Sequence, residues 1–169
     1  MLSVLRSHGV RFVLVGGIAA VVEGAPITTF DVDVVHERSD ANVRRLIAAL
    51  KDLKARYRTR PELDRSPSLE DLLGPGHHLL STRFGPLDVL GVVGKDRAFA
   101  SLARNARRRK IGSCFVLVLD LETQIAVKRE LGFAKDRLAL PLLEAALASE
   151  KKHTPRRRPT SSPSPRSRP

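Results

Sequence analysis

The sequence of 169 residues has little of what disulfide-linked, membrane-spanning or aromatic-rich proteins need. Its single cysteine, Cys114, excludes an internal disulfide and a site built from several cysteine ligands. The longest apolar stretch, Phe12 to Val22, has eleven residues and two glycines, whereas a membrane-spanning helix needs about 20. The N-terminal residues lack a continuous apolar segment with a cleavage site, so no secretory signal is predicted and we expect a cytoplasmic protein.

Aromatic residues make up 4% of the chain, with no tryptophan and one tyrosine, so a platform that stacks successive bases is not predicted. Acidic residues are few as well, 18 against 30 Lys and Arg, which gives a net charge of +12. Residues 151–169 hold seven of the basic residues and no acid, and from Pro155 onward they use only Pro, Arg, Ser and Thr. We therefore expect one domain over residues 1–150 and a disordered basic tail over 151–169.

The remaining sequence alternates β-rich runs with amphipathic segments. The patterns predict a mixed sheet of four or five strands flanked by helices, in the α/β or α+β class. The expected strands cover residues 10–15, 30–35, 78–83, 87–93 and 114–119, the third and fourth being joined as a hairpin at Gly85-Pro86. The expected helices cover residues 18–22, about 40–53, 97–104, 120–131 and 134–147, the last interrupted at Pro141.

Two acids, Asp31 and Asp33, alternate with valines and therefore project from one face of the second expected strand. Carboxylates so placed repel each other and lose solvation. One interpretation is the solvent-facing side of an edge strand. The other is a divalent cation site, because hard oxygen ligands suit Mg²⁺ and the ion reverses the repulsion.

Two further features bear on this choice. Asp88 lies in a second apolar strand, where it is either a surface acid or a third ligand. Gly16-Gly17 ends the first strand, where it is either an ordinary turn or a place for backbone N–H groups to approach a phosphate at a helix N-terminus. The glycine-rich fingerprints of dinucleotide-binding and P-loop proteins are absent from the sequence.

In this order, Val15-Gly16-Gly17, thirteen residues and Asp31-Val32-Asp33-Val34 resemble the signature of the nucleotidyltransferase superfamily that includes DNA polymerase beta. The wider run from Gly16 to Val35 is similar to small prokaryotic nucleotidyltransferases related to abortive-infection toxins. The segment Phe84–Leu90 and the pair Lys135-Asp136 are similar to that group as well. The resemblance covers most of residues 5–147 and implies the nucleotidyltransferase fold.

The resemblance also implies a chemistry: Mg²⁺-dependent transfer of a nucleoside monophosphate from an NTP to a hydroxyl acceptor. Two ions about 3.5–4 Å apart would be held by Asp31, Asp33 and Asp88, with Asp88 also placed to take the acceptor proton. Gly16 and Gly17 would hold the β- and γ-phosphates, and Thr29 would add a hydroxyl contact. The acceptor is an RNA end, a protein or a small molecule, and a toxin with a separate antitoxin protein is one setting that the resemblance allows.

Other candidate residues are less specific. Lys128 shares a helical face with Leu121 and Ile125, so it either snorkels from the edge of that face or contacts the triphosphate. Relatives often carry a basic residue at this place, which suits the second interpretation. Lys135 and Asp136 are interpreted as a structural pair at the start of the last helix rather than as catalytic residues. Ile27 and the residues 132–134 depart from the relatives, which often carry basic residues at these places. His77 and His78 point to opposite faces of a strand and are not expected to bind metal together.

The run Arg104–Lys110 contains five cations and reads either as a solvated surface or as an electrostatic footprint for an acceptor such as RNA. Two other functions therefore stay open beside the enzyme. One is a catalytically degenerate domain that binds nucleotide or RNA. The other is a basic RNA-associated protein that acts through this run and the tail.

Overall fold

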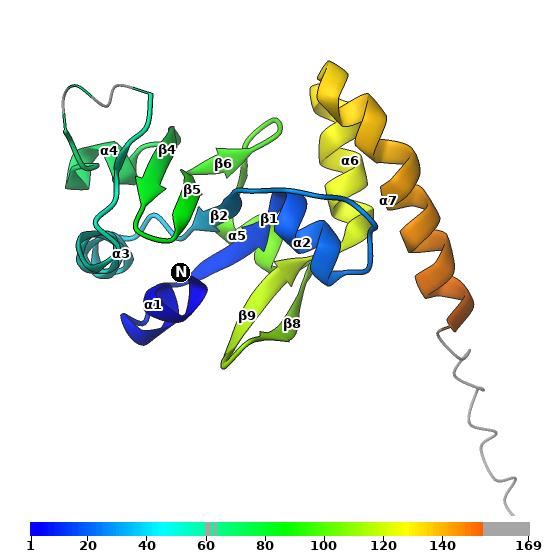
Figure 1. Ribbon diagram of the computed structural model, residues 1–169, viewed down its shortest axis with the longest axis horizontal. Coiled ribbons are helices and arrows are strands. Elements are labelled where there is room, and N and C mark those ends of the chain that lie inside the picture. The colour runs from blue at the N-terminus through cyan, green and yellow to red at the C-terminus, as the bar shows by residue number, and fades with distance from the viewer. Residues whose placement is uncertain (60–61, 63, 154–169) are drawn as a thin grey trace, which may run out of the picture.

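A seven-stranded mixed sheet forms the centre of the molecule (Figure 1). The computed structural model describes residues 1–59, 62 and 64–153, without the side chains of 134–137 and 153. The strand order is β3-β4-β5-β2-β1-β9-β8, and β6 and β7 form a separate two-stranded ribbon. The strands are β1 (Phe12–Val15), β2 (Val32–His36), β3 (Arg56–Tyr57), β4 (His77–Thr82), β5 (Gly85–Leu90), β6 (Val92–Val93), β7 (Arg97–Ala98), β8 (Ala106–Ile111) and β9 (Cys114–Leu119).

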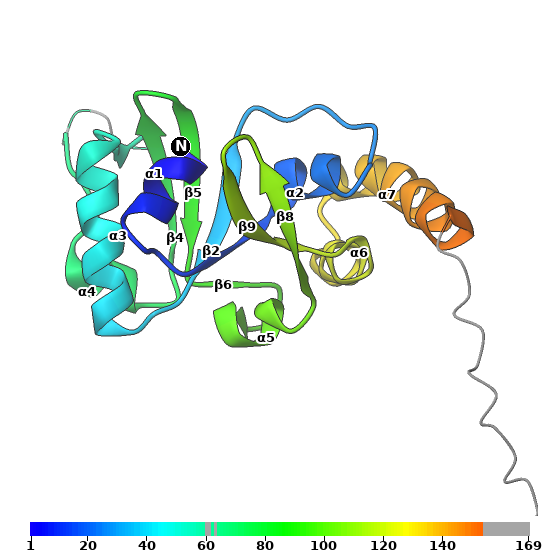
Figure 2. The same ribbon diagram turned by 90° about the horizontal axis from the view of Figure 1, so that it is seen from below.

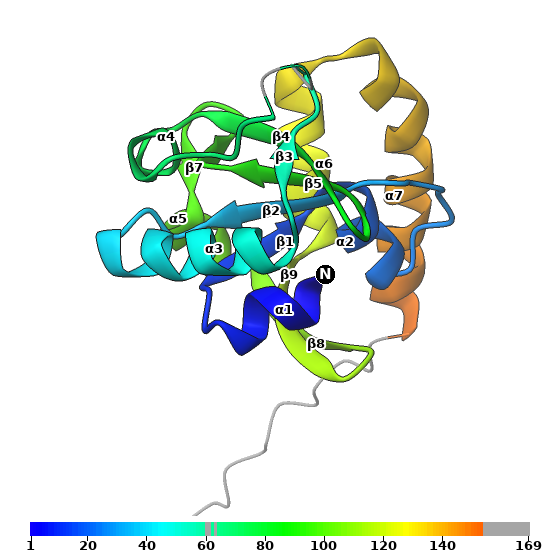
Figure 3. The same cartoon turned by 60° about the vertical axis from the view of Figure 1, so that its left-hand side comes forward.

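Seven helices are found in the described part of the chain, and they cover the sheet unevenly. They are α1 (Leu2–Ser7), α2 (Gly16–Val22), α3 (Asp40–Asp52), α4 (Leu69–Leu73), α5 (Phe99–Ala103), α6 (Leu121–Leu131) and α7 (Ala134–His153). Figure 2 shows α3 and α4 at one end of the molecule and α6 and α7 at the other, and Figure 3 brings α3 in front of the strands. None of the described helices is long and apolar enough to cross a membrane.

Three apolar clusters follow from the alternation of side chains along the strands. The largest packs α1, α3 and α4 against one face of the sheet, through residues such as Leu5, Leu46 and Leu72. On the opposite face, Phe99 and Leu102 of α5 join a second cluster. The third joins the short helix α2 to α6 and α7. The sheet is thus buried on both faces, which explains the continuous apolar runs of β1 and β9.

The expected mixed α/β architecture is confirmed, and the hairpin of β4 and β5 closes at Gly85 as the sequence indicates. The sheet has seven strands where four or five were expected. The first addition, β3, has two residues and gives almost no periodic signal. The second, β8, is the cationic run itself, which pairs with β9 as the antiparallel edge strand of the sheet. Its alternation places charges on both faces, so no apolar period marks it as a strand.

The C-terminal helix is longer than the sequence indicates. α7 continues through Lys151 and Lys152 to His153 and contains Pro141 within it. The predicted contact between Lys135 and Asp136 involves side chains outside the described part. The rest of the predicted tail, residues 154–169, also lies outside the described residues.

One acid that the sequence does not single out organises the cations of β8. The Glu23 side chain, at the end of α2, is 1% exposed. Arg109 donates two hydrogen bonds to it, of 2.7 and 2.9 Å, and Arg107 lies 3.5 Å from it. The hydrogen bond to Glu23 raises the pKa of Arg109. Arg107 and Arg109 therefore stabilise the fold. Arg108 and Lys110 alternate with them along the strand and project from the opposite face of β8.

Replacing Arg109 by glutamine is expected to lower the free energy of unfolding by about 2 kcal/mol, because a buried carboxylate loses its bidentate partner while Arg107 remains. Lys110→Gln removes the same charge from the next position of β8, and we expect it to change stability by less than about 0.5 kcal/mol. Urea unfolding of the two variants measures the difference. Equal losses of stability in the two variants would show that the ion pair between Arg109 and Glu23 stabilises the fold no more than an exposed cation does.

Candidate metal and nucleotide site

The register of two parallel strands brings two of the predicted acids together. β2 is the central strand of the seven, between β5 and β1, and its Asp33 is the register partner of Asp88 in β5. Val34 and Val89 point into the cluster under α3, so Asp33 and Asp88 project from the opposite face. The edge-strand interpretation of Asp31 and Asp33 is wrong, since hydrogen-bonded strands flank β2 on both sides.

Asp31 completes a compact cluster of carboxylates just before β2 begins. One carboxylate oxygen from each of Asp31, Asp33 and Asp88 lies within 4.8 Å of the others. Asp88 is only 7% exposed, so its interpretation as a surface acid of an amphipathic strand is also wrong. Three carboxylates this close, one of them buried, need positive charge nearby.

The glycine pair fits tightly against the acids. Gly16 has φ of +68°, and a Cβ added there would lie 2.0 Å from Oδ2 of Asp33. A Cβ at Gly17 would lie 2.6 Å from Oγ1 of Thr29, whose hydroxyl donates a 2.6 Å hydrogen bond to Asp31. Both glycines belong to the first turn of α2, where backbone N–H groups have no partner within the helix. Both positions therefore require glycine, because any side chain would displace Asp33 or Thr29.

A cation that sequence reasoning missed occupies part of this cluster. Arg58, which follows β3, donates from Nη1 to Oδ1 of Asp88 and from Nη2 to Oδ2 at 3.0 Å. The hydrogen bond to Asp88 is the main cause that raises the pKa of Arg58, and the charges of Asp88, Asp31 and Asp33 add to it. Arg58 also donates to the carbonyl oxygen of Leu80, at 3.3 Å. The guanidinium thus neutralises part of the charge that the three acids share.

The donor set suits a hard divalent cation. All three candidate ligands are carboxylate oxygens, the type that Mg²⁺ binds in sites completed by phosphate and water. A cationic group already lies on one of the three acids, which shows that the cluster accepts positive charge at this place. Asp31, Asp33 and Asp88 therefore fit a divalent cation, with Arg58 as a competitor for Asp88.

The remaining predicted residues lie on neighbouring elements. Lys128 is half-buried on α6, on the same helical face as the buried Leu121 and Ile125, and α6 packs with α2 in the third apolar cluster. His77 and His78 do point to opposite sides of β4. His77 is exposed, and the buried His78 accepts or donates a 2.8 Å hydrogen bond with the hydroxyl of Tyr57. Neither histidine belongs to the acidic cluster.

Comparison with known proteins places the fold. The chain is similar to a solved protein from Thermotoga maritima described as a "putative nucleotidyltransferase", with a TM-score of 0.51 and 18% sequence identity. The similarity covers 89% of this chain and 91% of that one. No family model and no curated protein matches the sequence. The chain thus has a fold found in a structure described as a putative nucleotidyltransferase, and it carries three clustered aspartates, two of them on the adjacent strands β2 and β5.

Proposed function

We propose that this protein is a nucleotidyltransferase, which moves a nucleoside monophosphate from an NTP to a hydroxyl group with the help of Mg²⁺ and releases pyrophosphate. The observation that carries the proposal is the register of β2 and β5, which places Asp33 beside Asp88 next to the glycine turn. The fold likeness to the Thermotoga maritima protein supports the same class.

The proposal assigns a role to each residue of the site. Asp31, Asp33 and Asp88 hold Mg²⁺, which when bound supplies charge stabilisation at the phosphoryl oxygens. The N–H groups of Gly16 and Gly17 bind the β- and γ-phosphates, and Thr29 orients Asp31 through its hydroxyl. Asp88 accepts the proton of the acceptor hydroxyl, and Lys128 binds the triphosphate.

The acceptor in this proposal is an RNA end, a protein side chain or a small molecule. The resemblance to abortive-infection toxins suggests a setting in which a separate antitoxin protein controls the activity. Residues 1–150 form the transferase domain in this proposal, and the basic residues after it add affinity for an anionic acceptor.

Calorimetric titration of the four NTPs, each with and without Mg²⁺, tests the proposal on the wild-type protein. Binding that requires Mg²⁺ and that prefers one NTP is the expected result, and it would name the donor nucleotide. The Asp31→Asn/Asp33→Asn double variant should show none of it. Absence of NTP binding by the wild type under all conditions would contradict the proposal.

A domain that binds nucleotide without turnover is the second candidate, and the Arg58 contact is the observation in its favour. While Arg58 holds both oxygens of Asp88, that carboxylate is not available to an ion. Turnover requires Mg²⁺ to displace the Arg58 guanidinium from Asp88, whereas a domain that only binds nucleotide does not require it.

Replacing Arg58 by methionine is expected to tighten Mg²⁺ binding about tenfold, because a charged hydrogen bond worth about 1.5–3 kcal/mol no longer competes for Asp88. Without the ion, the variant should melt at a lower temperature than the wild type, since the buried carboxylate has lost its partner. Melting curves over a Mg²⁺ titration measure both effects. Arg65→Met, which removes an exposed cation from the same connection, serves as the control. Unchanged affinity in Arg58→Met would show that the guanidinium and the ion do not share Asp88.

A further inference from the structure

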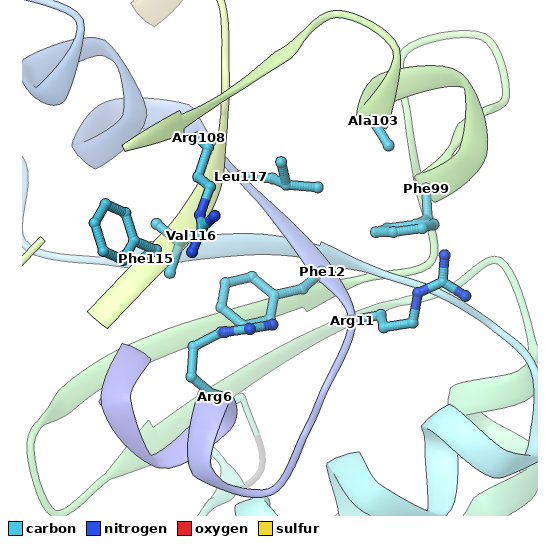
Figure 4. A pocket seen from close by; sticks show the side chains of 9 residues that line it. All are labelled: Arg6, Arg11, Phe12, Phe99, Ala103, Arg108, Phe115, Val116 and Leu117. Atoms are coloured by element: carbon cyan, nitrogen blue, oxygen red, sulfur yellow. The ribbon is translucent and has the colours of Figure 1, made fainter. Parts of the chain in front are cut away.

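A concave surface lies at the start of β1, and Figure 4 shows the side chains that line it. The acidic cluster lies near the other end of this strand. The concave surface has a volume of about 320 Å³ and is lined by residues of α1, β1, α5, β8 and β9 together with Arg11, which precedes β1. Its wall includes Phe12, the first residue of β1, whereas Asp33 pairs with Val15, the last. At about 3.3 Å per residue these two ends are about 10 Å apart, so this hollow is distinct from the metal site.

Three arginines surround the hollow, and no acid is among the described residues that line it. Arg6 comes from α1, Arg11 from the residue before β1 and Arg108 from β8. Arg11 forms an ion pair with Glu37 at 2.7 Å, whereas no ion pair of Arg6 or Arg108 is found in the described part of the chain. Like charges gathered around one concavity repel each other, and an anionic ligand removes that repulsion. The charge therefore predicts a ligand with more than one negative group.

Aromatic rings hold two of these arginines in place. The Arg11 guanidinium lies 5.2 Å from the ring centroid of Phe99, and that of Arg108 lies 4.4 Å from the ring centroid of Phe115. Stacking of this kind fixes the plane of a guanidinium and lowers the entropy lost on binding. Figure 4 shows the Phe12 side chain among the three arginines, and Phe12 is buried while Phe115 is 46% exposed.

We propose that this hollow binds single-stranded nucleic acid. One unstacked base lies against its apolar floor, formed by the apolar residues of the lining such as Phe12, Ala103 and Leu117, and the flanking phosphates lie on Arg6 and Arg108. The volume is at the lower end of the range of about 300–1,000 Å³ found for ligand pockets, which suits one nucleotide unit. An apolar floor under a cationic rim matches an exposed base between phosphates. A duplex keeps its bases stacked and would leave the floor uncovered. This inference does not depend on the proposed transferase activity.

The sequence alone does not suggest this surface, because aromatic residues are few. The fold compensates for that scarcity by bringing three of the six phenylalanines to one hollow. It also separates the cations of β8. Arg107 and Arg109 neutralise Glu23, and Arg108 is left to face the hollow.

Fluorescence anisotropy with a labelled, unstructured ten-nucleotide RNA tests the proposal on the full chain. Arg6→Gln/Arg108→Gln should weaken binding at least tenfold and should reduce the slope of log affinity against log salt by about 1.4, since each phosphate contact in a single strand contributes about 0.7. Arg44→Gln/Arg129→Gln removes the same net charge from two exposed helical positions, and it should change affinity less than about twofold. Equal losses in the two double variants would overturn the proposal.

The floor has its own test. Ala103→Trp fills the hollow without changing its charge, and it should weaken RNA binding about tenfold while the salt slope stays the same. If that variant does not fold, Phe115→Ala removes an exposed apolar ring from the lining instead and should also weaken RNA binding. RNA binding unaffected by the floor variant would overturn the base-in-hollow arrangement.

Two other ligands and one further variant complete the experiment. Equal or tighter binding of a duplex of the same length would overturn the single-strand assignment, and so would AMP binding as tightly as the oligonucleotide. Asp31→Asn/Asp33→Asn should still bind the RNA, so a failure of the transferase proposal leaves this inference standing. Loss of RNA binding in that variant would instead place the strand on the acidic cluster and overturn the assignment to the hollow.

Discussion

The Asp31→Asn/Asp33→Asn variant is expected to lose at least about a thousandfold in the rate of nucleotide transfer. Each asparagine keeps the shape of the side chain but removes a charged ligand from the cluster with Asp88. Loss of metal stabilisation of the transferring phosphoryl group costs several kcal/mol, and each 1.36 kcal/mol is a factor of ten in rate. Transfer of labelled nucleotide from the NTP identified by calorimetry into cell extract measures the loss.

The matched control is Asp52→Asn, which removes an exposed acid at the end of α3, and its rate should equal that of the wild type. Circular dichroism of all three proteins shows whether the fold is retained. A double variant that is folded and transfers nucleotide at the wild-type rate would remove Asp31 and Asp33 from the chemistry.

Replacing Gly16 by alanine should damage both stability and metal binding. The backbone there has φ of +68°, which costs an L-residue about 1–2 kcal/mol, and the new Cβ would lie 2.0 Å from Oδ2 of Asp33. The carboxylate must therefore move away from its place beside Asp88. We expect the free energy of unfolding to fall by about 2–3 kcal/mol and Mg²⁺ affinity to fall at least tenfold, measured by urea unfolding and calorimetry.

Gly112→Ala separates the cost of the positive φ from the effect of the contact with a neighbouring side chain. Gly112 has a similar φ of +57° in the turn between β8 and β9, but no atom of the described residues lies within 4 Å of the position of an added Cβ. This variant should lose only the backbone contribution, about 1–2 kcal/mol, and should bind Mg²⁺ as the wild type does. If both glycine variants bind the ion equally, the contact between Gly16 and Asp33 does not position the site.

Local patterns account for much of the fold. The apolar spacing of residues 43–53 predicts α3, and the structure has this helix at Asp40–Asp52 with Ser39 at its N-cap position. Asp120 was expected to begin the next long helix, and its side chain accepts a 2.8 Å hydrogen bond from the N–H of Thr123 in α6. These elements are predictable because their capping and amphipathic residues lie within one or two turns of each other.

The candidate site was only partly predictable for the opposite reason. The same-face placement of Asp31 and Asp33 follows from two-residue spacing, but Asp88 gives only a weak signal until β5 is aligned with β2. Arg58 pairs with Asp88 across 30 positions, and Arg109 pairs with Glu23 across 86. Sequence periodicity indicates which residues of one helix or strand share a face, so it does not predict contacts between residues this far apart in the sequence. The N-terminal helix α1 was missed because its six residues are too few for an amphipathic pattern.

The class of fold, the glycine turn and the alternating acids follow from local sequence, because each depends on residues that are close along the chain. Which charges meet depends instead on the folded arrangement of the strands. This arrangement aligned Asp33 with Asp88, placed Arg58 on that pair, and divided the cations of β8 between Glu23 and the hollow beside Phe12. Strand order and register set these contacts, and they depend on how the whole sheet buries its two apolar faces.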